Sequence, residues 1–90
     1  MNKKELVAEV ARRANITAKD SEMFVDTVFD AISDHLVEND KVVISNFGTF
    51  EVRVRAARTG INPATGESIS IPEQRTPAFK AGKQLKDRLR

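Results

Sequence analysis

The segment from Arg53 to Arg75 constrains the fold of this chain more than any other. It has the pattern of two strands joined by a strong turn signal, Asn62-Pro63-Ala64-Thr65-Gly66. Its apolar residues are few, namely Val54, Ile61, Ile69 and Ile71. Because an isolated two-stranded ribbon is marginally stable in water, we expect this segment to pack against a surface that is not its own core.

The charge of the ribbon indicates what that surface is. One predicted strand carries Arg53, Arg55 and Arg58, and the other carries only Glu67 and Glu73 as acidic residues. A guanidinium group stays charged and can form bidentate hydrogen bonds with phosphate. If these charges served only to prevent edge-to-edge aggregation of the strand, lysine and a mixture of basic and acidic residues would be expected. The pattern therefore favours an arm that lies along nucleic acid.

The length of 90 residues predicts one domain. With about 25 residues in the ribbon, the remaining ~65 form a core that supplies only about 3–5 kcal/mol. Cysteine is absent and His35 is the only histidine, which leaves no disulfide framework and no cluster of metal ligands. Oligomerisation remains as a means of stabilisation, so we expect a dimer without metal or cofactor.

The charge is distributed unevenly along the chain. Residues 1–47 hold six Lys/Arg and nine Asp/Glu, whereas residues 48–90 hold nine and four. The second half is therefore suited to meet a polyanion and the first half is not. No apolar stretch is long enough for a signal peptide or a membrane span, so an intracellular, soluble protein is expected.

The first forty residues predict a helical hairpin. Asn2 with Glu5 caps a helix that starts near Lys3, and Thr17 with Asp20 caps a second helix from about Ala18 to Val37. Apolar side chains recur at helical spacing: Leu6, Val7, Val10, Ala11 and Ala14, then Phe24, Val25, Val28, Phe29, Ile32 and Leu36.

The second half predicts strands and a short helix. Residues 42–44 have the composition of a buried strand, residues 46–48 turn the chain, and residues 49–54 return as an alternating strand. Pro72 and Pro77 predict a strand end or edge, and a last helix is expected over about 82–90. The fold class is α+β.

Four blocks of the second half resemble the bacterial histone-like HU family and its relative, integration host factor. They stand in the family's order and spacing: Asn46-Phe47-Gly48-Thr49-Phe50-Glu51-Val52, Arg55-Ala56-Ala57-Arg58-Thr59-Gly60, Asn62-Pro63-Ala64-Thr65-Gly66 and Pro77-Ala78-Phe79-Lys80-Ala81-Gly82-Lys83-Gln84-Leu85-Lys86. The helical hairpin also fits, so the resemblance covers the whole chain.

The resemblance implies an intertwined dimer that binds the minor groove of DNA and kinks it with a proline at each arm tip. It implies a single domain over residues 1–90, with a helical dimerisation body over 1–40, and with a three-stranded antiparallel sheet, an arm at about 52–76 and the last helix within 41–90. Pro63 is the implied intercalating residue. The other implied DNA-binding residues are Lys3, Arg53, Arg55, Arg58, Asn62, Thr65, Gly66, Arg75, Lys80, Lys83 and Lys86.

Two positions depart from the family pattern. Ile61 stands where the family usually has arginine, which removes one cation per arm and adds an apolar group beside Pro63. Asn46 stands where glycine is usual, and because asparagine tolerates a left-handed conformation, we expect the turn to persist.

Several residues have simpler roles. Phe29, Phe47, Phe50 and Phe79 are expected in the core of the dimer rather than stacked on bases. Acidic residues at steps of four on the second helix form a solvated ridge, away from DNA or paired with Lys3 or Lys4: Glu22, Asp26, Asp30, Asp34 and Glu38. Nucleophilic and metal chemistry lack the necessary residues, so no enzyme is expected.

We therefore predict a homodimeric architectural protein of the bacterial nucleoid, in the cytoplasm, that binds double-stranded DNA with little sequence preference, bends it and helps condense it. It should favour bent, nicked or junction DNA and take no membrane or small-molecule partner. The alternatives are a site-specific DNA-bending protein like integration host factor and a module that adds a strand to a partner's sheet.

Overall fold

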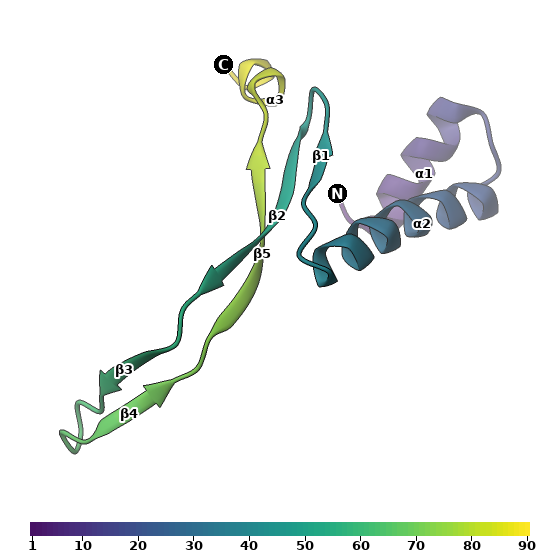
Figure 1. The fold of residues 1–90 in the computed structure, drawn as a ribbon. Helices are drawn as coiled ribbons and strands as arrows, with labels where there is room; N and C mark the ends of the chain where they lie inside the picture. The colour runs from purple at the N-terminus through teal and green to yellow at the C-terminus, as the bar shows by residue number, and fades with distance from the viewer. The chain divides into compact units, whose positions relative to one another are not determined.

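The computed structural model describes residues 1–90, which divide into two compact units, 1–34 and 35–90 (Figure 1). The elements are α1 (Lys3–Ala14), α2 (Ala18–Val37), β1 (Val42–Ile44), β2 (Gly48–Arg55), β3 (Arg58–Ile61), β4 (Ser68–Ile71), β5 (Gln74–Ala81) and α3 (Lys83–Arg88). None of the helices combines the length and the apolar character needed to cross a membrane.

The predicted helix starts in the first unit are confirmed. Asn2 Oδ1 accepts a hydrogen bond of 2.9 Å from the Glu5 N–H, and Thr17 Oγ1 accepts one of 3.1 Å from the Asp20 N–H. Asn15 ends α1 in the left-handed region, with φ of 55°. These local signals place both helices within a residue of the predicted bounds.

The two helices of the first unit are joined by few buried groups. Ser21 is fully buried and its hydroxyl donates to the Val7 carbonyl oxygen at 2.7 Å. Lys3 Nζ lies 2.6 Å from Asp26 Oδ1, which confirms a pairing expected for the acidic ridge. Val25 is the only buried apolar side chain of the whole chain, at 8% exposure. The predicted inward stripe of α2 is therefore mostly unburied within a single chain.

The second unit contains a three-stranded antiparallel sheet in the order β1-β2-β5. Gly48 lies opposite both Ile44 and Ala81, so β2 is the central strand. The strand predicted at 42–44 is confirmed, but its predicted burial is wrong for the single chain, since Val43 is 61% exposed. β1 is an edge strand, and burying its outward face requires a second layer.

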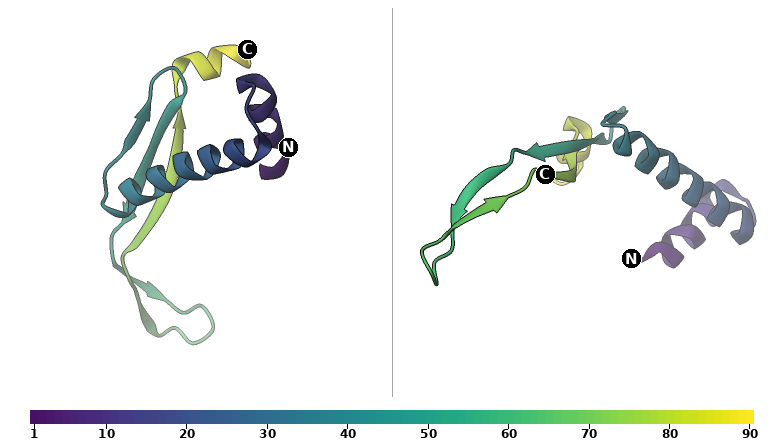
Figure 2. Two further views of the ribbon diagram at one scale, coloured as in Figure 1. Left: turned by 90° about the vertical axis from the view of Figure 1, so that its right-hand side faces the viewer. Right: turned by 60° about the horizontal axis from the view of Figure 1, so that its bottom comes forward.

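The long ribbon is confirmed as an arm with one interruption. The β2–β5 ladder ends at Arg55 opposite Gln74 and resumes as β3–β4 at Arg58 opposite Ile71, so both strands skip two residues and the register is unchanged. Pro72 lies in this gap and has no N–H to donate. Both views of Figure 2 show the paired strands continuing side by side into the arm.

The remaining expectations for the second unit are met with small differences. Pro77 lies inside β5, which is an edge strand and tolerates a residue without an N–H. Asn46 adopts φ of 68°, as expected of an asparagine in place of glycine. The last helix ends at Arg88, earlier than the sequence pattern predicts.

Candidate nucleic-acid interface

The tip of the arm is a turn held by its own hydrogen bonds. The Asn62 N–H donates to the Glu67 carbonyl oxygen at 2.8 Å, and the Gly66 N–H donates to the Asn62 carbonyl oxygen at 2.7 Å. Asn62 Oδ1 also accepts from the Ala64 N–H at 2.9 Å. Gly66 has φ of 75°, a conformation that suits glycine. The turn is thus shaped locally and leaves Pro63 exposed at the end of the arm.

The predicted tip residues consequently divide into two kinds. Asn62, Thr65 and Gly66 shape the turn, since Thr65 Oγ1 accepts from the Glu67 N–H at 3.3 Å. Pro63 and Ile61 remain as apolar side chains available to a partner, and Ile61 is 70% exposed. The tip therefore exposes apolar surface. It carries no charged side chain between Arg58 and Glu67.

Strand pairing places three of the cations of β2 and β5 on one face. Arg53, Arg55 and Lys80 belong to successive cross-strand pairs with the same orientation, because side chains alternate between faces. The opposite face carries the pair Phe50 and Phe79. We call the first the cationic face of the sheet. It brings together three predicted site residues, from the root of the arm and from the sheet.

Arg58 lies beyond the interruption of the ladder, in a different part of the arm from Arg53 and Arg55. In the β3–β4 ladder it is paired with Ile71, and Gly60 is paired with Ile69. A Cβ atom at Gly60 would lie 3.0 Å from Ile71 Cδ1 and 3.5 Å from Ile69 Cγ1, so these side chains share one surface. Arg58 therefore adjoins an apolar surface of the arm, which has few other cations.

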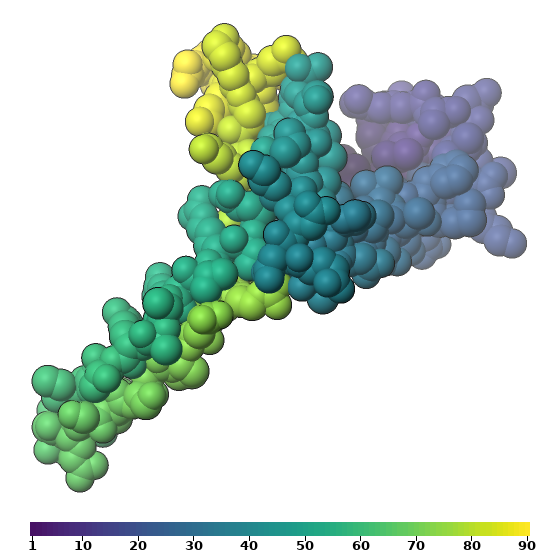
Figure 3. All heavy atoms as spheres, in the orientation of Figure 1, coloured from purple at the N-terminus to yellow at the C-terminus, as the bar shows by residue number.

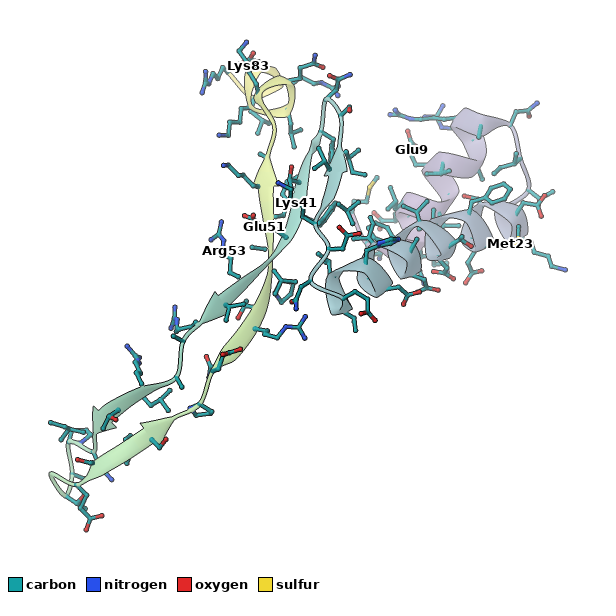
Figure 4. The ribbon with its side chains drawn as sticks, in the orientation of Figure 1. Glu9, Met23, Lys41, Glu51, Arg53 and Lys83 are labelled. Carbon is teal, nitrogen blue, oxygen red and sulfur yellow. The ribbon has the colours of Figure 1, made fainter.

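Nothing in this structure covers the arm in the view of Figure 3, where it projects as a narrow finger from the second unit. Most of its cations are also free of carboxylates. Arg53 has a loose contact of 3.7 Å with Glu51, and the two side chains project from the same side of β2 (Figure 4). No ion pair forms at Arg55, Arg58, Lys80 or Lys86. These side chains remain available to anions in solution.

Two other predicted contact residues are paired within the chain. The hydrogen bond and the charge of Asp26 raise the pKa of Lys3 above its ordinary value of 10.5. Lys83 Nζ lies 3.1 Å from Asp87 Oδ2, one turn further along α3. Both ion pairs are exposed and therefore weak, so a phosphate can replace the carboxylate.

Arg75 lies apart from the other arm cations. It is paired with Val54, on the face opposite to the cationic face, and its guanidinium group contacts the end of α2. Sequence reasoning missed its partner Asn39, which is 36 residues away. The available signal was the turn at 62–66, which sets the register of the two strands and so places residue 75 opposite residue 54.

Three phenylalanines form a cluster on the face of the sheet opposite to the cationic face. The ring centroids of Phe47 and Phe79 are 5.3 Å apart, and those of Phe50 and Phe79 are 5.0 Å apart. Phe47 and Phe79 are still more than two-fifths exposed, and Phe29 of α2 is about half exposed. The rings pack against each other in tilted pairs, which suits a core that a further layer completes.

Comparison with known families places these features in context. A sequence model of the family described as "Bacterial DNA-binding protein" matches residues 1–90. DNA-binding protein HU-1 of Halalkalibacterium halodurans is 56% identical over 87 residues, covering 97% of each chain. DNA-binding protein HU of Streptococcus mutans is 55% identical over 86 residues, covering 96% of this chain and 94% of its own.

Solved structures show the same similarity in three dimensions. The cocrystal structure of Anabaena HU with DNA matches with a TM-score of 0.86 and 42% identity, covering 99% of this chain and 97% of that one. The structure of HU from Thermotoga maritima matches with a TM-score of 0.71 and 32% identity over the whole of both chains.

Proposed function

The chain belongs to the HU family of bacterial DNA-binding proteins, and we propose that it bends double-stranded DNA as a homodimer with little sequence preference. As a member of this family it is a DNA-binding architectural protein and not an enzyme. The observation that carries the proposal is the cationic face at the root of an arm without a core of its own, where Arg55 and Lys80 form no ion pair and Arg53 has only a loose one. Condensing the chromosome within the cytoplasmic nucleoid is the role that such bending serves.

The dimer is supported by the lack of a core in the single chain. Only Val25 is buried among the apolar side chains, whereas Phe29, Phe47 and Phe79 are all substantially exposed. Since apolar burial contributes roughly 25 cal/mol per Å², a chain of this size is stable only when a second layer covers these groups. We assign that layer to a second copy, with residues 1–40 as the dimerisation body of a single domain over 1–90.

Pro63 is proposed as the wedge that enters the minor groove. It lies exposed on a turn that Asn62 and Gly66 hold in shape, so its position is fixed without using its own side chain. Inserting an apolar wedge between base pairs costs a few kcal/mol per step, and the contacts made by the bent duplex offset that cost. The kink should therefore form more readily where stacking is already broken.

The basic residues supply affinity by contacting phosphates. The free cations of the arm and the sheet act directly, and Lys3 and Lys83 act after exchanging a carboxylate for a phosphate. These contacts are independent of base sequence because phosphates carry no sequence information. The proposed set is Lys3, Arg53, Arg55, Arg58, Lys80, Lys83 and Lys86, together with Asn62, Thr65 and Gly66 at the tip.

A gel-shift comparison of linear, nicked and four-way-junction DNA at two salt concentrations tests this function. The protein should bind all three, should prefer the nicked and junction forms, and should bind each more weakly at the higher salt. A protein that binds none of these duplexes at low salt would refute the proposal. Equal affinity for all three forms would refute the bending role while leaving DNA binding intact.

A further inference from the structure

The C-terminal end of α2 is closed by a hydrogen-bonded motif that leaves one carbonyl without a backbone donor. The Asp40 N–H donates to the His35 carbonyl oxygen at 2.9 Å, and the Asn39 N–H donates to that of Leu36 at 3.0 Å. Asn39 has φ of 59°, so the chain leaves the helix through a left-handed residue. This is the Schellman pattern, and the Val37 carbonyl oxygen lies outside it.

Arg75 supplies the missing donor from β5, far away in the sequence. Its Nη2 donates to the carbonyl oxygens of Val37 at 3.0 Å and Leu36 at 3.2 Å. Nη2 and Nε also donate to Asn39 Oδ1, at 2.6 and 3.1 Å. One guanidinium group thus reaches the last two helical carbonyls and the side chain of the residue that ends the helix.

The surroundings of Arg75 differ from those of a phosphate-binding arginine in two independent ways. Its partners are all neutral oxygens at the negative end of a helix dipole, and it forms no ion pair with a carboxylate. It also lies on the face opposite to Arg53 and Arg55, as the pairing with Val54 shows. Its hydrogen-bonding groups point toward α2 and not outward from the cationic face.

We propose that Arg75 is a positioning residue that fastens the root of the arm to the end of α2 and thereby sets the direction in which the arm leaves the sheet. It lies next to the interruption of the ladder, adjacent to Gln74, which forms the last β2–β5 pair with Arg55. A strand pair that continues without a third strand bends easily, so a tether at this point limits its movement. The consequence for bent DNA rests on the function proposed above.

An arginine suits this position better than a lysine. The planar guanidinium group presents several donors in a fixed geometry, and here four hydrogen bonds use that geometry. A lysine would keep the charge near the helix end but could not span Asn39 and the carbonyls in the same way. The Arg75→Lys variant therefore separates geometry from charge.

Four single variants test the proposal in the full-length protein, with thermal unfolding as the first measurement. Arg75→Gln and Arg75→Lys should each lower the Tm. Asn39→Gly should lower it too, although glycine suits the left-handed position, because it removes the Oδ1 acceptor. The Asn39→Gly/Arg75→Gln double variant should lose less than the sum of the two losses. Arg55→Gln, the matched control, should leave the Tm unchanged.

The second measurement follows the arm itself without DNA. Amide order parameters from ¹⁵N relaxation should fall at Val54 and Gly60 in both Arg75 variants and stay unchanged in Arg55→Gln. This readout remains informative if the protein does not bend DNA, so failure of the tether and failure of the proposed function are distinguishable. It also separates positioning from a general loss of stability, which lowers the Tm without loosening the folded arm.

The third measurement uses DNA at saturating protein. Energy transfer between dyes at the duplex ends should show an altered bend for Arg75→Gln and Arg75→Lys, with an unchanged slope of log affinity against log salt. Arg55→Gln should instead make that slope shallower. A shallower salt slope for Arg75→Gln with unchanged Tm and arm order would identify a phosphate contact and overturn the proposal. A lower Tm with unchanged order parameters in the arm and an unchanged DNA bend would show that Arg75 only caps the helix. That result would also overturn the proposal.

Discussion

Gly48 lies against the ring of Phe79. A Cβ atom at position 48 would be 2.5 Å from Phe79 Cζ and 2.7 Å from the Lys80 carbonyl oxygen. Gly48 is buried in the central strand, and the ring of Phe79 leaves no room for a side chain at this position. The phenylalanine cluster therefore depends on a glycine that forms part of the turn motif in the sequence.

Gly48→Ala should strongly destabilise the protein. The added methyl group meets backbone and an aromatic ring that is itself packed, and such overpacking typically costs about 1–3 kcal/mol. Denaturant unfolding monitored by circular dichroism measures the loss. Gly66→Ala is the control, because a Cβ there meets nothing within 4 Å and only the left-handed backbone, with φ of 75°, opposes it. A smaller loss for Gly48→Ala than for Gly66→Ala would contradict this account.

Phe79→Ala should abolish the folded dimer. The ring contacts both Phe47 and Phe50, and removing a large core aromatic typically costs about 3–5 kcal/mol. Sedimentation at several protein concentrations, together with circular dichroism, measures assembly and folding. Finding a stable, folded monomer would show that the exposed aromatic face is not part of a dimer core.

Pro63→Ala should impair bending more than binding. The substitution removes the wedge, while the hydrogen bonds of Asn62 and Gly66 and all arm cations remain. Energy transfer between labelled DNA ends and a parallel affinity titration separate the two effects. Ile61→Ser is a matched change at the tip that removes exposed apolar surface and keeps the proline. An unchanged bend angle for Pro63→Ala would exclude the wedge role.

DNA affinity should fall steeply with salt concentration. If about half of the proposed basic residues of a dimer contact phosphate, the slope of log affinity against log salt is roughly −6. Arg55→Gln removes one free cation per protomer and should make the slope shallower by about 1.8, since each phosphate contact contributes roughly 0.9. Lys41→Gln, an exposed cation outside the proposed set, is the control and should leave the slope unchanged. A slope near zero for the natural sequence would refute phosphate binding.

The Lys3–Asp26 ion pair should contribute stability that disappears at alkaline pH. Asp26 raises the pKa of Lys3 in the folded protein above its ordinary value of 10.5, first through its hydrogen bond and then through its charge. The contribution is therefore complete below pH 10.5 and is lost as the pH rises through the raised pKa. Comparing the free energy of unfolding of the natural sequence with that of Asp26→Asn across this range measures it. A difference that stays constant with pH would show that the pair does not titrate as described.

Local chemistry was sufficient to predict most of the secondary structure. Helix starts at Lys3 and Ala18, the turn at 62–66 and the left-handed Asn46 all depend on hydrogen bonds or backbone preferences within a few residues. The bounds of α2 could be read directly from the sequence for this reason. The arm was likewise predictable, because its strands are adjacent in the chain and share one turn.

The sequence by itself determined where helices, strands and the arm tip form, and that the second half of the chain is basic. Only the tertiary structure decided which cations are free: it placed Arg53, Arg55 and Lys80 on one face, Arg58 beside apolar side chains, and Arg75 against Asn39. It also showed that the strand at 42–44 is exposed in the single chain. The physical reason is the distance along the chain over which each interaction acts. Capping and turn formation involve residues that are near neighbours in the sequence, whereas burial and ion pairing depend on segments that only folding brings together.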